Sequence, residues 1–128
     1  MSPPAEDLTE RFDPIECLDE RIRSRAAAER PLAPGRYLEV QGAERSLTIP
    51  LGDEVLHIGR GLSADVRLDE NSVSRRHAIL LPRPAAPRIL DDRSSNGTLV
   101  NGRRVTQADL SDGDVILIGR VPLRYLEV

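Results

Sequence analysis

Side chains that can hold an anion are concentrated in three short stretches of this sequence. GRGLSAD spans 59–65, NSVSRRH spans 71–77 and DDRSSNGTLVNG spans 91–102. These stretches supply hydroxyl, amide and guanidinium donors, whereas carboxylates that could act as general bases are few. Arginine is the side chain whose shape best suits a bidentate contact with phosphate. The residue types therefore predict a site that binds an oxyanion and leaves it chemically unchanged.

Several kinds of catalysis lack the residues that they need. All 18 basic residues are arginine, which excludes a Walker-type phosphate loop, a Schiff-base lysine and the ATP-binding lysine of a kinase. One cysteine, Cys17, and two separated histidines, His57 and His77, are too few for a zinc cluster. Ser74 and His77 could pair in a hydrolase, but no GxSxG motif accompanies them, and we expect His77 to brace its loop. The sequence predicts neither an enzyme nor a metal or cofactor site.

Short apolar runs predict that the three stretches are loops of an all-β domain. From residue 36 onward the runs recur about every 8 to 12 residues and are separated by Gly, Asp, Asn and Pro, which is typical of a sandwich or barrel. Residues 79–81 and 115–118 are almost wholly apolar, so we expect them in central strands. Residues 37–41 alternate in polarity, which predicts one solvated face. The nine runs are RYLEVQ, SLTIPL, VLHIG, VRL, HAILLP, RIL, TLV, VILIG and PLRYLEV.

Residues 1–35 differ from this pattern and are predicted to form an N-terminal tail before a domain over 36–128. Three apolar residues recur at helical spacing after an Asp-Pro pair that can cap a first turn, so the tail is predicted to be partly helical around 15–30. The apolar stripe is narrow, so such a helix needs a surface on which to dock. Two alternatives stay open, a flexible tail with a nascent helix and a docked helix. The apolar residues are Ile15, Leu18 and Ile22, and the pair is Asp13-Pro14.

The overall composition limits the partners. The net charge is −3 and only three residues are aromatic, so we expect no nucleic-acid binding, which needs a basic surface or a stacking platform. No apolar run approaches the roughly 20 residues that span a bilayer, so we expect no membrane insertion. The acidic start, MSPPAEDLTERF, lacks the apolar segment of a secretory signal. The sequence therefore predicts a cytoplasmic protein.

Four blocks within the three stretches match a known family. Gly59-Arg60 is followed by Ser74-Arg75-Arg76-His77, then by Ser94-Ser95-Asn96-Gly97-Thr98, and then by Asn101-Gly102. In order and spacing the blocks closely resemble the forkhead-associated (FHA) domain, over about residues 37 to 128. One block alone would be a weak signal, whereas four in order within an all-β pattern are specific. The resemblance implies an FHA-type β-sandwich of about eleven strands with its binding loops at one end.

The resemblance also implies a role for each matching residue. FHA domains bind phosphothreonine peptides. The phosphate would be contacted by Arg60, Ser74, Arg75 and Ser95, and the peptide backbone by Asn96. Guanidinium, hydroxyl and amide groups suit these roles, since they donate to phosphate or both donate to and accept from a backbone. The residues expected to support the site structurally are Gly59, His77, Gly97 and Asn101.

The favoured function is a phosphothreonine-peptide-binding adaptor in serine/threonine-kinase signalling, without catalysis. Its partner would be a protein that carries phosphothreonine, either a kinase or its substrate. The alternative is a phospho-independent module for protein interaction or oligomerisation that uses the FHA scaffold. Thr9 lies in an acidic, proline-flanked stretch and is a candidate phosphosite. Three outcomes stay open for it, namely intramolecular capture by the FHA domain, capture by a second molecule, and no modification.

Overall fold

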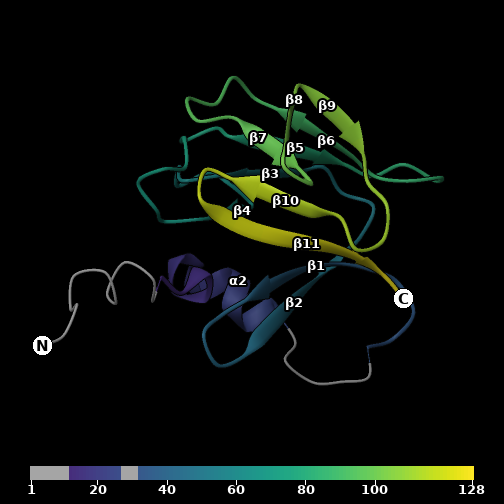
Figure 1. Ribbon diagram of the computed structural model, residues 1–128. Helices are drawn as coiled ribbons and strands as arrows, with labels where there is room; N and C mark the ends of the chain where they lie inside the picture. Colours follow the sequence, from purple (N-terminus) through teal and green to yellow (C-terminus); the bar gives the residue numbers. More distant parts are fainter. Residues whose placement is uncertain (1–11, 27–31) are drawn as a thin grey trace, which may run out of the picture.

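Two β-sheets pack against each other in this protein, and their strands are joined by loops at both ends (Figure 1). The computed structural model describes residues 12–26 and 32–128, and within them there are eleven strands. One sheet has the order β2 (Ser46–Leu51), β1 (Arg36–Gln41), β11 (Val121–Glu127), β10 (Val115–Ile118), β7 (Thr98–Val100) and β8 (Arg103–Val105). The other has the order β4 (Val66–Arg67), β3 (Leu56–Gly59), β5 (Ala78–Leu81), β6 (Arg88–Asp91) and β9 (Gln107–Asp109). The predicted all-β sandwich of about eleven strands is confirmed.

Nine of the strands coincide with the nine apolar runs, and two short strands lie outside these runs. These two strands are β8 and β9, each only three residues long and largely exposed. Each has only one partly buried side chain, so neither carries an apolar pattern, and they form because their backbones pair with β7 and β6. The expectation of central strands is confirmed, because β5 and β10 each have neighbours on both sides.

The core between the sheets is aliphatic, as the sequence predicts. Leu38, Ile58 and Ile116 are completely or almost completely buried and belong to one hydrophobic cluster that both sheets share. Burying one such side chain stabilises the fold by about 1.5–3 kcal/mol before the loss of chain entropy is subtracted. The predicted solvated face of β1 is wrong at Glu39, which is only 5% exposed. In the sheet Glu39 lies between Thr48 of β2 and Arg124 of β11, so polar neighbours flank it on both sides.

The helical part of the N-terminal region is shorter than predicted and is divided in two. A 3₁₀ turn, η1 (Pro14–Cys17), is followed by a helix, α2 (Glu20–Arg25). The predicted cap is confirmed, since Asp13 Oδ1 accepts the backbone N–H of Ile15 at 3.0 Å. The prediction of one continuous helix is wrong, because Leu18 is extended. Asp19 caps the second helix by accepting the N–H of Ile22 at 3.1 Å. The remaining stretch of the predicted helix, 27–30, lies outside the described residues.

Residues 12–26, here called the N-terminal segment, pack on the sandwich at the end that carries the β3–β4 and β4–β5 loops, here called the loop end (Figure 1). Ile15, Leu18 and Ile22 are each 2% exposed and join the core cluster of the sheets. The backbone joins as well, because the N–H of Asp69 donates to the carbonyl of Cys17 at 2.7 Å. Of the two alternatives for the helical part, the docked one is therefore correct for these residues. The division of the chain at residue 35 stays a prediction.

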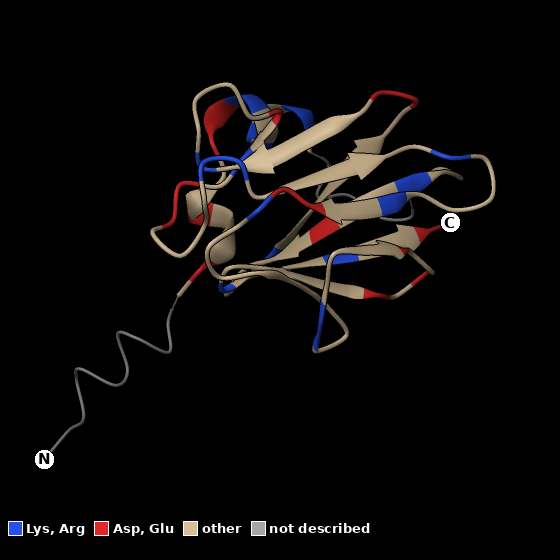
Figure 2. Ribbon diagram, turned by 90° about the horizontal axis from the view of Figure 1, so that it is seen from above, with Lys and Arg blue, Asp and Glu red and all other residues tan. Residues whose placement is uncertain are grey.

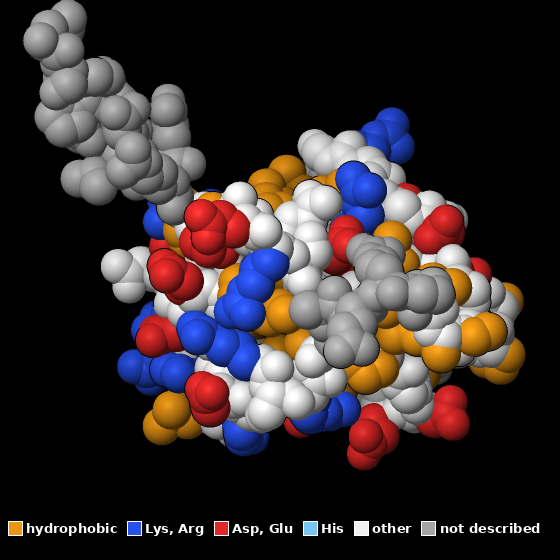
Figure 3. Space-filling model, turned by 90° about the horizontal axis from the view of Figure 1, so that it is seen from below, with side chains coloured by type: hydrophobic (Ala, Val, Ile, Leu, Met, Phe, Trp, Pro, Cys, Tyr) orange, Lys and Arg blue, Asp and Glu red, His pale blue; other side chains and the backbone are white. Residues whose placement is uncertain are grey.

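Charges of both signs are interspersed over the strands and loops (Figure 2). On the underside of the molecule, too, acidic and basic side chains lie side by side, next to hydrophobic ones (Figure 3). Among the described residues no helix has the length and apolar character needed to cross a membrane. In the same part of the chain no three His, Cys, Asp or Glu side chains are grouped so as to hold a metal ion.

Candidate functional site

Five residues predicted to contact a ligand line one open pocket at the loop end of the sandwich. Arg60 comes from the β3–β4 loop, Ser74 and Arg75 from the β4–β5 loop, and Ser95 and Asn96 from the β6–β7 loop. This loop pocket has a volume of about 280 Å³. Two guanidinium groups and no carboxylate line it, so its local field favours an anion. Its other lining residues are Asn71, Ser72 and Val73.

Backbone hydrogen bonds hold the first two loops together. The N–H of Arg60 donates to the carbonyl of Ser74 at 2.9 Å, and the N–H of Gly61 donates to the carbonyl of Arg75 at 3.1 Å. Gly59 permits this approach, because a Cβ at that position would lie 2.1 Å from the carbonyl oxygen of Arg75. A side chain at position 59 would prevent this close approach, so the glycine before Arg60 allows Arg60 to lie beside Ser74.

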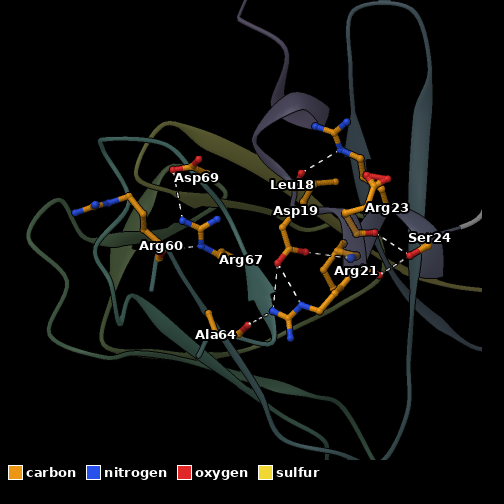
Figure 4. A network of polar contacts seen from close by, with 11 residues as sticks. Leu18, Asp19, Arg21, Arg23, Ser24, Arg60, Ala64, Arg67 and Asp69 are labelled. Atoms are coloured by element: carbon orange, nitrogen blue, oxygen red, sulfur yellow. Dashed lines mark hydrogen bonds and ion pairs between the residues drawn. The ribbon is translucent and has the colours of Figure 1, made fainter. Parts of the chain in front are cut away.

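The side chain of Arg60 is held at one point and is otherwise available to a ligand. Its Nε–H donates to the carbonyl of Val73 at 2.9 Å. Its own carbonyl accepts the Nε–H of Arg67 at 3.0 Å. Figure 4 shows the Arg60 guanidinium pointing away from Arg67 and Asp69. The Nη groups can therefore make the bidentate contact for which a guanidinium is suited.

His77 is completely buried and joins two of the binding loops. Its Nδ1 accepts the backbone N–H of Ser74 at 3.0 Å, and its Nε2 lies 2.8 Å from the carbonyl of Gly97. Since that carbonyl can only accept, Nε2 carries the proton and the ring is a neutral bridge. The Ser74 hydroxyl oxygen accepts the N–H of Ser95 at 2.9 Å, which leaves its proton to be donated into the pocket. His77 therefore braces the loops and does not contact the Ser74 hydroxyl as a base would.

Asp91 holds the β6–β7 loop in shape from below the pocket. Its Oδ1 accepts the hydroxyls of Ser94 at 2.5 Å and Thr98 at 2.8 Å, and its Oδ2 accepts the N–H of Ser94 at 3.2 Å. Burial alone would raise the pKa of Asp91, but these hydrogen bonds hold it below its ordinary value. The Ser94 hydroxyl oxygen also accepts the N–H of Gly97 at 2.9 Å. This carboxylate thus fixes the backbone that carries Ser95 and Asn96.

Asn96 is oriented by a chain of contacts that sequence reasoning missed. Its Nδ2 donates to the carbonyl of Ser72 at 2.8 Å, which leaves Oδ1 to accept a peptide N–H. Ser72 is held in turn, because its N–H donates to Glu70 Oε1 at 2.8 Å and its hydroxyl donates to the same oxygen. Arg120 closes the chain, donating its Nε–H to Glu70 Oε2 and its backbone N–H to the Ser72 hydroxyl oxygen, both at 2.9 Å. Burial opposes ionisation of Glu70, but the bonds from Ser72 and Arg120 hold its pKa below the ordinary value.

Of the other residues that the sequence singled out, Gly97 lies in a binding loop, Asn101 lies away from it, and Thr9 is not described by the structure. Gly97 lies at the turn of the third loop with φ +88°, a conformation that glycine adopts readily. Asn101 follows β7, at the end of that strand away from Asn96; its side chain donates to Asp114 at 2.9 Å and accepts from the N–H of Val115 at 3.0 Å. Asn101 therefore ties the β7–β8 turn to the start of β10 through a side-chain-to-backbone bond, and its support of the binding site stays a prediction. Thr9 lies outside the described residues.

At one end of this β-sandwich, three loops gather two guanidiniums, several hydroxyls and an amide in one pocket whose lining contains no carboxylate. The FHA domain model matches residues 56–119, which is half of the chain. The chain belongs to the forkhead-associated (FHA) domain family.

Relatives with this domain occur in mycobacteria. The ABC transporter ATP-binding/permease protein Rv1747 of Mycobacterium tuberculosis is 44% identical over 81 residues, which cover 63% of this chain and 9% of the transporter. The glycogen accumulation regulator GarA of the same species is 35% identical over 97 residues, covering 74% of this chain and 60% of GarA. The structure of Mycobacterium tuberculosis EmbR in complex with a low affinity phosphopeptide matches with a TM-score of 0.64 and 30% identity, covering 84% of this chain and 28% of EmbR. The chain thus spans less than two thirds of the length of these relatives.

Proposed function

We propose that this protein is a phosphothreonine-peptide-binding adaptor that acts in serine/threonine-kinase signalling and catalyses no reaction. The observation that carries the proposal is the loop pocket, in which donors from three loops converge and no carboxylate is present. EmbR, a structural neighbour, was solved with a phosphopeptide, which supports the same class of ligand here. The partner would be a kinase, or a kinase substrate, that carries phosphothreonine.

Each lining residue suits a different part of such a ligand. The Nη groups of Arg60, the guanidinium of Arg75 and the hydroxyls of Ser74 and Ser95 would donate to the phosphate oxygens. Asn96 would bind the peptide backbone through the Oδ1 that its bond to Ser72 leaves open. Val73 is the apolar residue of the lining, and we propose that the threonine methyl packs beside it. That contact would make phosphothreonine bind more tightly than phosphoserine.

Calorimetric titration with a phosphothreonine peptide and its threonine counterpart tests the proposal. Charge-assisted hydrogen bonds of about 1.5–3 kcal/mol each, reduced by the cost of ordering the peptide, predict a Kd in the micromolar range, about −8 kcal/mol. Arg60→Ala should weaken binding about tenfold or more, because one such bond is lost. Arg103→Ala is the matched control, since Arg103 is an exposed arginine of β8. Equal binding of the threonine and phosphothreonine peptides would overturn the proposal in favour of a phospho-independent interaction module.

Intramolecular capture of phosphorylated Thr9 is a further part of the proposal. Phe12, three positions after Thr9, has its ring 4.1 Å from the guanidinium carbon of Arg120. The backbone of Arg120 donates to Ser72, which lines the loop pocket. A fully extended chain of three residues spans about 10 Å. The tether starts at the rim of the pocket, and a short tether that reaches its site gives a high effective concentration.

Phosphorylating Thr9 and titrating the product with an external phosphothreonine peptide tests this capture. Binding of the external peptide should be lost at protein concentrations at which the chain is monomeric. Loss of binding only at high protein concentration would show capture by a second molecule instead. Unchanged affinity for the external peptide would show that phosphorylated Thr9 is not captured.

A further inference from the structure

A second pocket adjoins the loop pocket, and none of the roles described above uses it. This side pocket has a volume of about 320 Å³ and lies between the β3–β4 loop, the β4–β5 loop and the end of β6. Arg75 lines both pockets. Ser72, Ser95 and Asn96 line the loop pocket alone, whereas the other polar residues of the side pocket do not reach the loop pocket. Those residues are His57, Ser63, Arg76 and Asp92.

The charged groups of the side pocket leave donors available. Arg76 donates its Nε–H to Asp92 Oδ2 at 3.1 Å, a contact that leaves its two Nη groups for a ligand. The Arg76 side chain is 80% exposed, whereas that of Asp92 is 16% exposed, so the arginine faces outward over its partner. Arg75 and Ser63 are exposed beside them. Two arginines against one aspartate give the lining a net charge of +1.

The walls of the side pocket are fixed by backbone hydrogen bonds. The N–H of Asp92 donates to the carbonyl of His77 at 2.8 Å, and the N–H of His77 donates to the carbonyl of Ile58 at 3.0 Å. On the opposite wall, the carbonyl of Ala64 accepts from the guanidinium of Arg21 in α2 at 3.2 Å, as Figure 4 shows. The docked N-terminal segment therefore steadies the loop that forms this wall. A pocket on fixed backbone can select a ligand without first being ordered.

We propose that the side pocket is a subsite for an anionic side chain of the bound peptide, on one flank of the phosphothreonine. The inference rests on the proposed function, since the peptide must first be held at the loop pocket. Because Arg75 lines both pockets, a peptide that continues from the loop pocket past Arg75 would reach the side pocket. There Arg76, Arg75 and the Ser63 hydroxyl offer donors to a carboxylate or a second phosphate. The net charge of +1 matches a single carboxylate better than a phosphate, which carries about −1.5 to −2 at neutral pH.

A set of phosphothreonine peptides tests the subsite. The parent peptide has alanine at the three positions on each side of the phosphothreonine. Each derivative has glutamate, or phosphoserine, at one of these six positions. The quantity compared is the ratio of the Kd of the parent to that of the derivative, measured by calorimetry within one protein variant. The subsite predicts a gain of about two- to fivefold for glutamate, the range of a partly exposed ion pair, at positions on one flank only.

Two variants of the side pocket should change this gain in opposite directions. Arg76→Gln removes a guanidinium and should abolish most of the gain. Asp92→Asn removes the competing carboxylate and should increase the gain. Arg103→Gln, an exposed arginine of β8 outside both pockets, should leave it unchanged. A larger gain from phosphoserine than from glutamate in the unaltered protein would identify a second phosphate as the preferred group within the same subsite.

The outcomes separate this inference from the proposed function. If the parent peptide does not bind, the phosphothreonine-binding function itself is wrong. If the parent binds and no glutamate or phosphoserine improves binding, the subsite does not exist. A gain that persists in Arg76→Gln, or that occurs equally on both flanks, would show only general attraction of negative charge and would also overturn the inference.

Discussion

Ile22→Ala should destabilise the whole sandwich, although the sequence alone places Ile22 in a tail. Ile22 is 2% exposed and belongs to the hydrophobic cluster that the two sheets share. The substitution removes three buried carbon atoms, about 2.4 kcal/mol at about 0.8 kcal/mol each. The cavity that remains adds to this loss, so the free energy of unfolding should fall by about 3 kcal/mol. For a domain of this size the melting temperature should fall by about 12 °C, at about 4 °C per kcal/mol.

Thermal and urea unfolding followed by circular dichroism measure this effect. Ser24→Ala is the matched control, because Ser24 is an exposed residue of the same helix, α2. A surface substitution of this kind changes the free energy of unfolding by no more than about 0.5 kcal/mol. An Ile22→Ala variant that is as stable as Ser24→Ala would refute the conclusion that the N-terminal segment is part of the core.

Four further predictions concern the binding loops. Gly59→Ala should reduce both stability in urea and peptide affinity, because its Cβ would lie 2.1 Å from a carbonyl oxygen; an unaffected variant would contradict the close approach of the loops. Glu70→Gln should weaken peptide binding about three- to tenfold in calorimetry, because Asn96 becomes less ordered; this loss is near the net energy of one ordinary hydrogen bond, about 0.5–1.5 kcal/mol, and unchanged affinity would show that Glu70 does not position Asn96. The folded-state pKa of Asp91 is lowered, so its carboxylate stabilises the fold above the unfolded-state value of about 3.9, and that stability is lost as the pH falls through the folded-state value. Urea unfolding at a series of pH values should therefore show a smaller acid loss for Asp91→Asn than for the unaltered protein, and equal losses would remove Asp91 from this role. Affinity for phosphothreonine peptides should decline from about pH 7 to pH 5, since the second phosphate pKa is about 6; calorimetry that shows constant affinity over this range would mean that the dianion is not the preferred form.

The fold was largely predictable because most strands bury at least one face. Runs such as 115–118 are apolar for that reason, and all nine runs became strands. The strands β8 and β9 have no apolar run, because their residues stay mostly exposed and backbone pairing defines them. Glu39 was assigned to a solvated face because its neighbours across β2 and β11 cannot be read from β1 alone.

The residues that line the loop pocket were expected from the sequence, whereas the residues that hold them in place were not. Arg60, Ser74 and Asn96 could be selected because they stand in donor-rich loops and in the short blocks that resemble the FHA family. Glu70 and Arg120 could not, although they hold Ser72 and through it Asn96. Neither residue belongs to a motif, and a charged residue in a loop is ordinarily read as solvated.

The sequence by itself determined the strand pattern, the order of the binding loops and the chemical character of the loop pocket. These properties depend on residues that are close together in the chain. Side-chain alternation, turn residues and loop composition can therefore be recognised in the sequence itself. Only the tertiary structure decided that the N-terminal segment joins the core, that Arg120 fixes Glu70, and that a side pocket forms beside Arg75. The bond between Arg120 and Glu70 joins residues 50 positions apart, and the bond from Arg21 to Ala64 joins residues 43 positions apart. Contacts at such separations leave no local pattern, because they depend on how the two sheets and the segment pack together.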